Sequence, residues 1–179
     1  MLDVGLRNYE AALHCAATVY EHDPPYSGSR VLPELVEAAV HSGERALAGR
    51  ALERLSERAL ATGTELALGL MARSQALFAE DCDAEHLYEE AIEHLERCQA
   101  APQLARAHLV YGKWLRRQRR RREGREHLRT AFEMFESMGA DGFAERARVE
   151  LVATGEHARK RSVEDANALT SQEHRSPGS

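Results

Sequence analysis

One spacing of residues recurs along this chain and restricts how it can fold. A small residue is followed four positions later by tyrosine or leucine, and three positions after that by alanine. These spacings place the three side chains on one face of an α-helix, where small residues let a second helix approach closely. We therefore expect closely packed helix pairs. The three clear copies are Gly5, Tyr9 and Ala12; Ala84, Tyr88 and Ala91; and Gly124, Leu128 and Ala131, with a looser copy at Ala48, Leu52 and Leu55.

Residues that break helices divide the chain into short helical segments. Proline and glycine predict a loop over residues 23–29, and Pro33 is expected in the first turn of the helix that follows. Asp83 is expected to cap a later helix, and Pro102 to open the next one. About eight helices result. A first helix near the N-terminus and a short one that ends at residues 42–43 precede helices over about 44–62 and 64–81. The next three extend from Asp83 past Leu95, from Pro102 to the arginine run, and from that run to Gly139, and the last covers about 142–154.

The composition agrees with an all-helical chain. Strong helix formers dominate, aromatic residues make up only 6% of the chain, and no long stretch alternates apolar and polar residues as a strand would. The triads resemble those of TPR proteins, so we predict an all-α fold of TPR-like antiparallel helix-hairpin repeats, an α-solenoid, over residues 1–155. The first triad fits the second helix of a hairpin, so the array starts in mid-repeat. An ordinary α-helical bundle is the alternative.

No motif in the sequence indicates catalysis. The phosphate-binding GxxxxGK[ST] and GxGxxG loops, the GxSxG nucleophile turn and the zinc-binding HExxH helix are all missing. The three cysteines, Cys15, Cys82 and Cys98, are odd in number and include no CxxC pair, which disfavours a disulfide framework or a zinc site. We therefore expect no enzyme, no cofactor and no metal.

Two sets of side chains have both a structural and a functional interpretation. His86, Glu90 and His94 share one helix face and could bind a metal weakly, but a solvated face is the favoured interpretation. Tyr111 and Trp114 also share a face, where core packing is favoured over lining a ligand groove.

The chain carries one concentrated basic segment. Residues 113–125 have a net charge of +7, although the whole chain is at −5. Glutamates flank the run and no aromatic residues interleave with it, so a solvated turn between two helices is favoured. Weak contact with nucleic acid or another polyanion is the alternative, through Arg116, Arg117, Arg119, Arg120, Arg121 and Arg122.

Several stretches resemble the last repeats of actinobacterial ATP-binding LuxR-family transcriptional regulators: residues 2–13, 32–39, 104–117, 143–148 and 153–156. In that family an ATPase domain precedes a TPR-like array, and a GerE-type helix-turn-helix follows it. Leu169, Thr170 and Glu173 match the Leu-Thr-x-x-Glu opening of the DNA-binding domain, but the chain ends soon afterwards. The resemblance therefore implies a truncated regulator that lacks both flanking domains, with residues 156–179 a disordered tail carrying that remnant.

The partners expected of such a segment are proteins, or a small effector in the repeat groove. Specific DNA binding is not expected, and self-association through the first helix is plausible because its face is unpartnered. No segment is apolar enough to span a membrane, so a cytoplasmic location is expected. A free-standing TPR-like adaptor and a weak nucleic-acid binder remain the alternatives.

Overall fold

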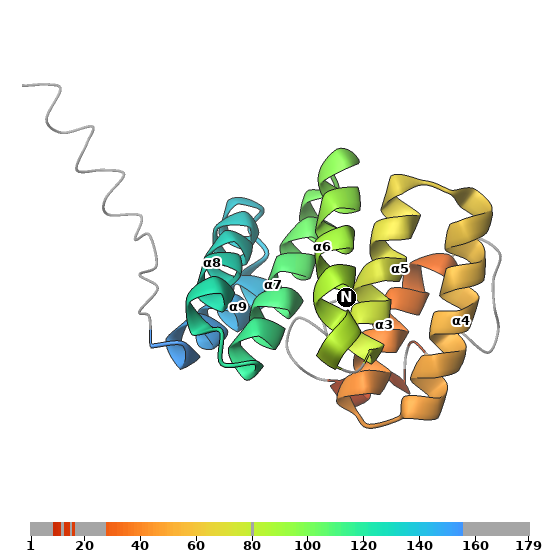
Figure 1. Ribbon diagram of the computed structural model, residues 1–179, viewed down its shortest axis with the longest axis horizontal. Helices are drawn as coiled ribbons and strands as arrows, with labels where there is room; N and C mark the ends of the chain where they lie inside the picture. The colour runs from red at the N-terminus through yellow and green to blue at the C-terminus, as the bar shows by residue number, and fades with distance from the viewer. Residues whose placement is uncertain (1–8, 12, 15, 17–27, 80, 156–179) are drawn as a thin grey trace, which may run out of the picture.

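The computed structural model describes residues 9–11, 13, 14, 16, 28–79 and 81–155, and these residues form helices joined by short turns, without a strand (Figure 1). The prediction of an all-α fold is therefore confirmed. The residues described between 9 and 16 are helical and precede α3. The later helices are α3 (Gly28–His41), α4 (Arg45–Thr62), α5 (Glu65–Phe78), α6 (Asp81–Arg97), α7 (Ala101–Arg117), α8 (Arg121–Ser137) and α9 (Asp141–Ala153).

The last four helices follow one another at a constant interval, since they begin at residues 81, 101, 121 and 141. The turns that separate them share one hydrogen-bonding pattern. A residue with positive φ follows each of α6, α7 and α8, at Gln99 (53°), Arg119 (65°) and Gly139 (66°). The next backbone N–H then donates to a carbonyl five residues back, which satisfies one of the helix's terminal acceptors. These bonds join Ala100 to Leu95, Arg120 to Leu115 and Ala140 to Phe135.

The sequence placed most helix ends correctly, and two starts were wrong. Gly28 and Ser29 belong to α3 and not to a loop, so Pro33 lies inside that helix, beyond its first turn. The missing N–H of Pro33 leaves only one backbone acceptor without its helical partner, which a helix can tolerate near its start. Asp83 is the third residue of α6 and therefore does not cap it. An acidic residue in a first turn is still favourable, because it faces the positive end of the helix dipole.

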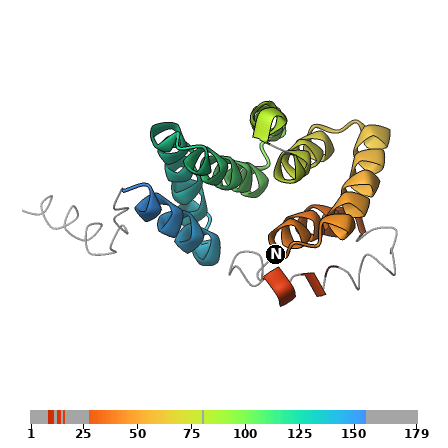
Figure 2. The ribbon, with the colours of Figure 1, turned by 60° about the horizontal axis from the view of Figure 1, so that its bottom comes forward.

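Consecutive helices pair as antiparallel hairpins. α3 packs on α4, α5 on α6, and α7 on α8, while α9 packs on α8. The first helices of the hairpins also contact one another, α3 with α5 and α5 with α7. Figure 2 shows the helices following an arc, with α3 and α9 at its two ends. This arrangement agrees with the hairpin repeats expected from the sequence.

The third triad lies where α7 and α8 approach most closely. A Cβ atom added to Gly112 would lie 2.8 Å from the carbonyl oxygen of Gly124, and one added to Gly124 would lie equally close to Gly112. Leu128 and Ala131 of the same face are fully buried. Glycine is needed at both positions because the two backbones touch.

The second triad is buried in the same way, and its neighbour across the hairpin is Gly69 of α5. A Cβ atom on Gly69 would lie 2.7 Å from Cγ of Leu95. Ala84, Tyr88 and Ala91 are all buried. In the first triad, Gly5 and Ala12 lie outside the described residues, as do the tail residues 156–179.

Aromatic side chains fill the core between the second and third hairpins. Tyr111 stacks on Tyr88 with ring centroids 5.1 Å apart, and Trp114 lies 6.0 Å from Tyr88. Tyr111 and Trp114 are therefore core residues. In the looser copy of the triad, Ala48 and Leu55 are buried and Leu52 is half-buried. Among the described residues, none of the helices combines the length and the apolar character that crossing a bilayer requires.

Candidate functional site

A buried glutamate connects three helices that are far apart in the sequence. Glu37 of α3 is fully buried. Its Oε2 accepts a hydrogen bond from Nη2 of Arg106 on α7 at 2.6 Å. Its Oε1 accepts one from Nη2 of Arg146 on α9 at 2.9 Å. One carboxylate therefore joins the first hairpin to the third hairpin and to the last helix.

Two further residues belong to this cluster. Glu34, one turn before Glu37, also pairs with Arg106. Arg73 of α5 is 1% exposed, and its charge acts on Glu37. We call Glu34, Glu37, Arg73, Arg106 and Arg146 the inner charge network. It contains residues of α3, α5, α7 and α9, the helices that lie on one side of the stack.

The electrostatics of the network favour full ionisation. Burial alone would raise the pKa of Glu37, but the charges of Arg106 and Arg146 outweigh burial and hold that pKa far below its usual value. Burial lowers the pKa of Arg106, yet Glu37 and Glu34 more than compensate, so the net shift is upward. Burial and the nearby Arg106 lower the pKa of Arg73 to about 10.

The network continues toward Tyr9, close to the start of the described residues. The guanidinium of Arg146 lies 5.7 Å from the centroid of the Tyr9 ring. That ring stacks on His41 at 4.3 Å, and Nε2 of His41 lies 3.0 Å from Nζ of Lys113 on α7. Burial and Lys113 lower the pKa of His41. Because the ring stays neutral, Nε2 can accept the hydrogen bond of the lysine.

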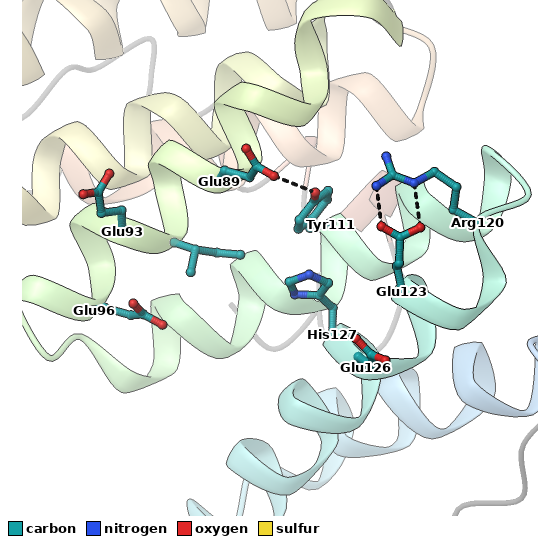
Figure 3. Close-up of a pocket in the computed structure, with 9 residues that line it drawn as sticks. Glu89, Glu93, Glu96, Tyr111, Arg120, Glu123, Glu126 and His127 are labelled. Carbon is teal, nitrogen blue, oxygen red and sulfur yellow. Dashed lines mark hydrogen bonds and ion pairs between the residues drawn. The ribbon is translucent and has the colours of Figure 1, made fainter.

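A second polar region is a cavity of about 410 Å³ between α6, α7 and α8. Figure 3 shows the glutamates of α6 on one side of it and those of α8 on the other, with Tyr111 and His127 between them. Its lining carries five carboxylates and one arginine, so it attracts cations. The lining residues are Glu89, Ile92, Glu93, Glu96, Tyr111, Arg120, Glu123, Glu126 and His127. We call this cavity the acidic pocket.

The one arginine of the acidic pocket does not balance its charge. Arg120 binds Glu123 through Nε and Nη2 (Figure 3). Its Nη1 lies 2.5 Å from Oε1 of Glu85. The hydroxyl of Tyr111 donates to Glu85 at 3.3 Å and to Glu89 at 3.5 Å. Glu93, Glu96 and Glu126 lie on the exposed rim of the cavity. The pocket can therefore receive a positively charged group against an aromatic wall.

His127 of the pocket lining pairs with a second histidine, His108. Nδ1 of His108 is 2.8 Å from Nδ1 of His127, so one ring donates to the other. Burial and the neighbouring His127 lower the pKa of His108 to about 4. Burial also lowers the pKa of His127. Protonation of the accepting Nδ1 would remove this hydrogen bond.

The six arginines of the basic run lie at the α7–α8 turn, and glutamates partly neutralise them. Arg116 binds Glu150 at 2.9 Å, Arg120 binds Glu85 and Glu123, and Arg122 lies 3.8 Å from Glu126. The other three, Arg117, Arg119 and Arg121, are exposed. The ion pairs lower the attraction of this surface for polyanions. Contact with a polyanion stays a prediction.

The histidine face of α6 is only partly solvated. His86 is exposed, but His94 is half-buried and its Nδ1 lies 2.6 Å from Glu65 of α5. Its other ring nitrogen lies 3.7 Å from Glu90. Within the described parts of the chain, no three His, Cys, Asp or Glu side chains are placed to hold a metal ion. Cys98 is half-buried and reduced.

Sequence reasoning missed the inner charge network and the histidine pair. A charged residue on a helix is usually solvated, so single charges carried little weight. A signal was nevertheless present, because Glu37, Arg73 and Arg106 each stand between small or apolar residues in the sequence. A charge on the apolar face of a predicted helix indicates a buried partner on another helix.

The comparisons with known proteins add nothing to this geometry, since no family model, curated protein or solved structure matches the chain.

Proposed function

We propose that this chain is a helical-repeat binding module of a LuxR-type transcriptional regulator, and that it acts by contact and not by catalysis. The observation that supports a binding role best is the acidic pocket, a cavity of about 410 Å³ between successive hairpins. Repeat arrays expose extended surfaces of this kind to their partners. The pocket holds carboxylates and rings but no nucleophile beside a base.

The charge of the acidic pocket defines the chemistry of its partner. Five carboxylates face one arginine that is already paired. A lysine or arginine side chain of a partner protein can place its charge among these carboxylates and its stem against Ile92 and Tyr111. We therefore infer that the partner presents a basic segment at this position.

Calorimetric titration with two synthetic peptides of equal length, one rich in lysine and arginine and one rich in glutamate, tests this binding role. The basic peptide should bind, and its affinity should fall as salt is added. Replacing Glu93 and Glu96 by glutamine should weaken binding several-fold. The matched control replaces Glu53 and Glu57, which are exposed on α4. Equal binding of both peptides, or equal loss in both variants, would refute the role of the pocket.

The DNA on both sides of the reading frame tests the link to LuxR-type regulators. It should encode an ATPase domain upstream and a helix-turn-helix downstream, in this frame or another. In that case the segment described here should bind no promoter by itself. If neither domain is encoded, the chain is instead a self-contained adaptor, and the match of Leu169, Thr170 and Glu173 is coincidental.

A further inference from the structure

The inner charge network holds more positive than negative charge. Arg73, Arg106 and Arg146 face two carboxylates, those of Glu34 and Glu37. Both of these carboxylates bind Arg106, and Glu37 binds Arg146 as well. Arg73 is therefore the arginine of the network to which neither carboxylate is hydrogen-bonded.

Part of the hydrogen-bonding capacity of the buried Arg73 guanidinium is unused. Its Nη1 donates to Oε1 of Gln103 at 2.8 Å. Its Nε and Nη2 have no hydrogen-bond partner among the described residues, although both atoms are fully buried. These two N–H groups are parallel and form the fork that binds the two oxygens of a carboxylate or phosphate. Leaving such charged donors unpaired in the interior is costly.

The surroundings of Arg73 hold more unpaired donors than acceptors. Among the described residues, Nε of Arg106 is also buried without a hydrogen-bond partner, and so are the hydroxyl of Tyr88, which can donate or accept, and one acceptor, Oε2 of Glu34. The charge of Arg106 acts on the ionisation of Arg73, and the charge of Arg73 acts on that of Tyr88, which places the three groups in one environment. Unpaired donors therefore predominate there. An oxyanion would supply the missing negative charge and the missing acceptors together.

We propose that Arg73 binds the carboxylate or phosphate group of a small molecule, held by its Nε–Nη2 fork between α3, α5 and α7. This inference rests on the proposed binding role of the array, and it names an anionic effector. It does not depend on the acidic pocket, which has the opposite charge. Because Arg73 is 1% exposed, the anion reaches it only when the surrounding helices separate, and its binding then holds them together.

Thermal unfolding in matched ionic strength tests the proposal. The probes are phosphate, acetate and succinate, each compared with chloride. The midpoint temperature should rise with the logarithm of the oxyanion concentration above its Kd, and chloride should have no such effect. A rise with phosphate alone identifies a phosphorylated effector, and a rise with acetate or succinate identifies a carboxylate.

Two substitutions of Arg73 test whether the oxyanions stabilise the fold by binding to this side chain. Arg73→Met removes the unpaired charge, so it should raise the midpoint temperature in chloride and abolish the response to oxyanions. Arg73→Lys keeps the charge but lacks the fork, so it should need about tenfold more oxyanion for the same rise. The control is Arg122→Gln, which removes the same charge from a side chain that is 91% exposed and should respond as the original chain does.

Two outcomes would overturn the proposal: no oxyanion stabilises the original chain beyond chloride, or Arg73→Lys responds as strongly as the original chain. The second comparison remains valid if Arg73→Met fails to fold. Failure here, with the basic peptide still binding the acidic pocket, would leave the proposed function intact. Failure of the peptide alone would leave the anion site intact.

Discussion

Glu37 is the residue on which the inner charge network depends. It is fully buried and accepts hydrogen bonds from two arginines on different helices. Two cations that share one buried carboxylate are both weakened in their pairing when that carboxylate is removed. A buried network of this kind does not have to stabilise the fold relative to an apolar one, but breaking it is costly.

Glu37→Gln should therefore lower the free energy of unfolding by about 3–5 kcal/mol, because it leaves Arg106 and Arg146 without their shared charge. Urea titration measures the change. The matched control is Glu53→Gln on the exposed side of α4, which should change stability by less than about 0.5 kcal/mol. Equal stability of the two variants would mean that the network does not depend on Glu37.

The depressed pKa of Glu37 also predicts how stability depends on acidity. The folded state holds this pKa below the usual value of 4.5, so the unfolded chain takes up a proton first as the pH falls. The contribution of Glu37 is then complete above pH 4.5 and is lost progressively below it. In Glu37→Gln this part of the acid-induced loss should disappear, which urea titrations at several pH values would show.

The histidine pair predicts a separate loss at milder acidity. Burial lowers the pKa of His108 from 6.5 to about 4, so the unfolded chain binds the proton first between these values. Stability should therefore fall as the pH is lowered from 6.5 to about 4, by at most about 3 kcal/mol for this group. His108→Gln should reduce the loss in that window, to which His127 and His41 also contribute through their lowered pKa values, and should leave the loss below it unchanged. NMR titration of the ring would check the pKa directly.

At the scale of the element, the hairpins depend on small residues where helices touch. α7 and α8 meet at Gly112 and Gly124, whose backbones are in contact. Glycine weakens an isolated helix, so its presence in α7 reflects the neighbouring helix and not the helix itself. Gly49 of α4 differs, because a Cβ atom there would meet only the Phe78 ring at 3.6 Å.

Two glycine-to-alanine substitutions should therefore have opposite effects. Gly112→Ala should destabilise the fold by about 1–3 kcal/mol, because its methyl group would overlap the Gly124 backbone. Gly49→Ala should stabilise it by about 0.5–1 kcal/mol through the better helix propensity of alanine. Midpoints of urea unfolding compare the two. Stabilisation by Gly112→Ala would show that the α7–α8 contact is looser than described.

At the scale of the whole molecule, the chain differs from a simple linear array. In linear arrays each repeat contacts only its neighbours, and the ends can unfold separately. Here Glu37 joins α3 to α7 and α9 directly. Unfolding should therefore be one transition, with circular dichroism and the fluorescence of Trp114, the single tryptophan, giving the same curve in urea. In Glu37→Gln the two curves should separate, because α3 and α4 can then unfold first.

The helices could be predicted well from the sequence, because glycine and proline act on the backbone at their own positions. Gly63, Pro102 and Gly139 mark helix ends through their own backbone preferences, and the triads mark packed faces by spacing alone. Gln99 and Arg119 adopt positive φ after their helices although neither is glycine, so residue type alone did not mark these two turns. The inner charge network could not be predicted in the same way. Its pairs join residues up to 109 positions apart, and no local rule fixes which charges meet.

The bond between Glu37 and Arg146 also sets a limit on length. An open stack of hairpins can gain or lose a unit without disturbing the others. Here the Glu37 carboxylate connects the two ends of the arc. The distance between α3 and α9 is therefore limited by the reach of the Glu37 and Arg146 side chains. An inserted hairpin would carry Arg146 out of reach and leave a buried charge behind, and a deleted one would force the same groups to overlap. The bond between Glu37 and Arg146 thus limits how many hairpins this fold can contain.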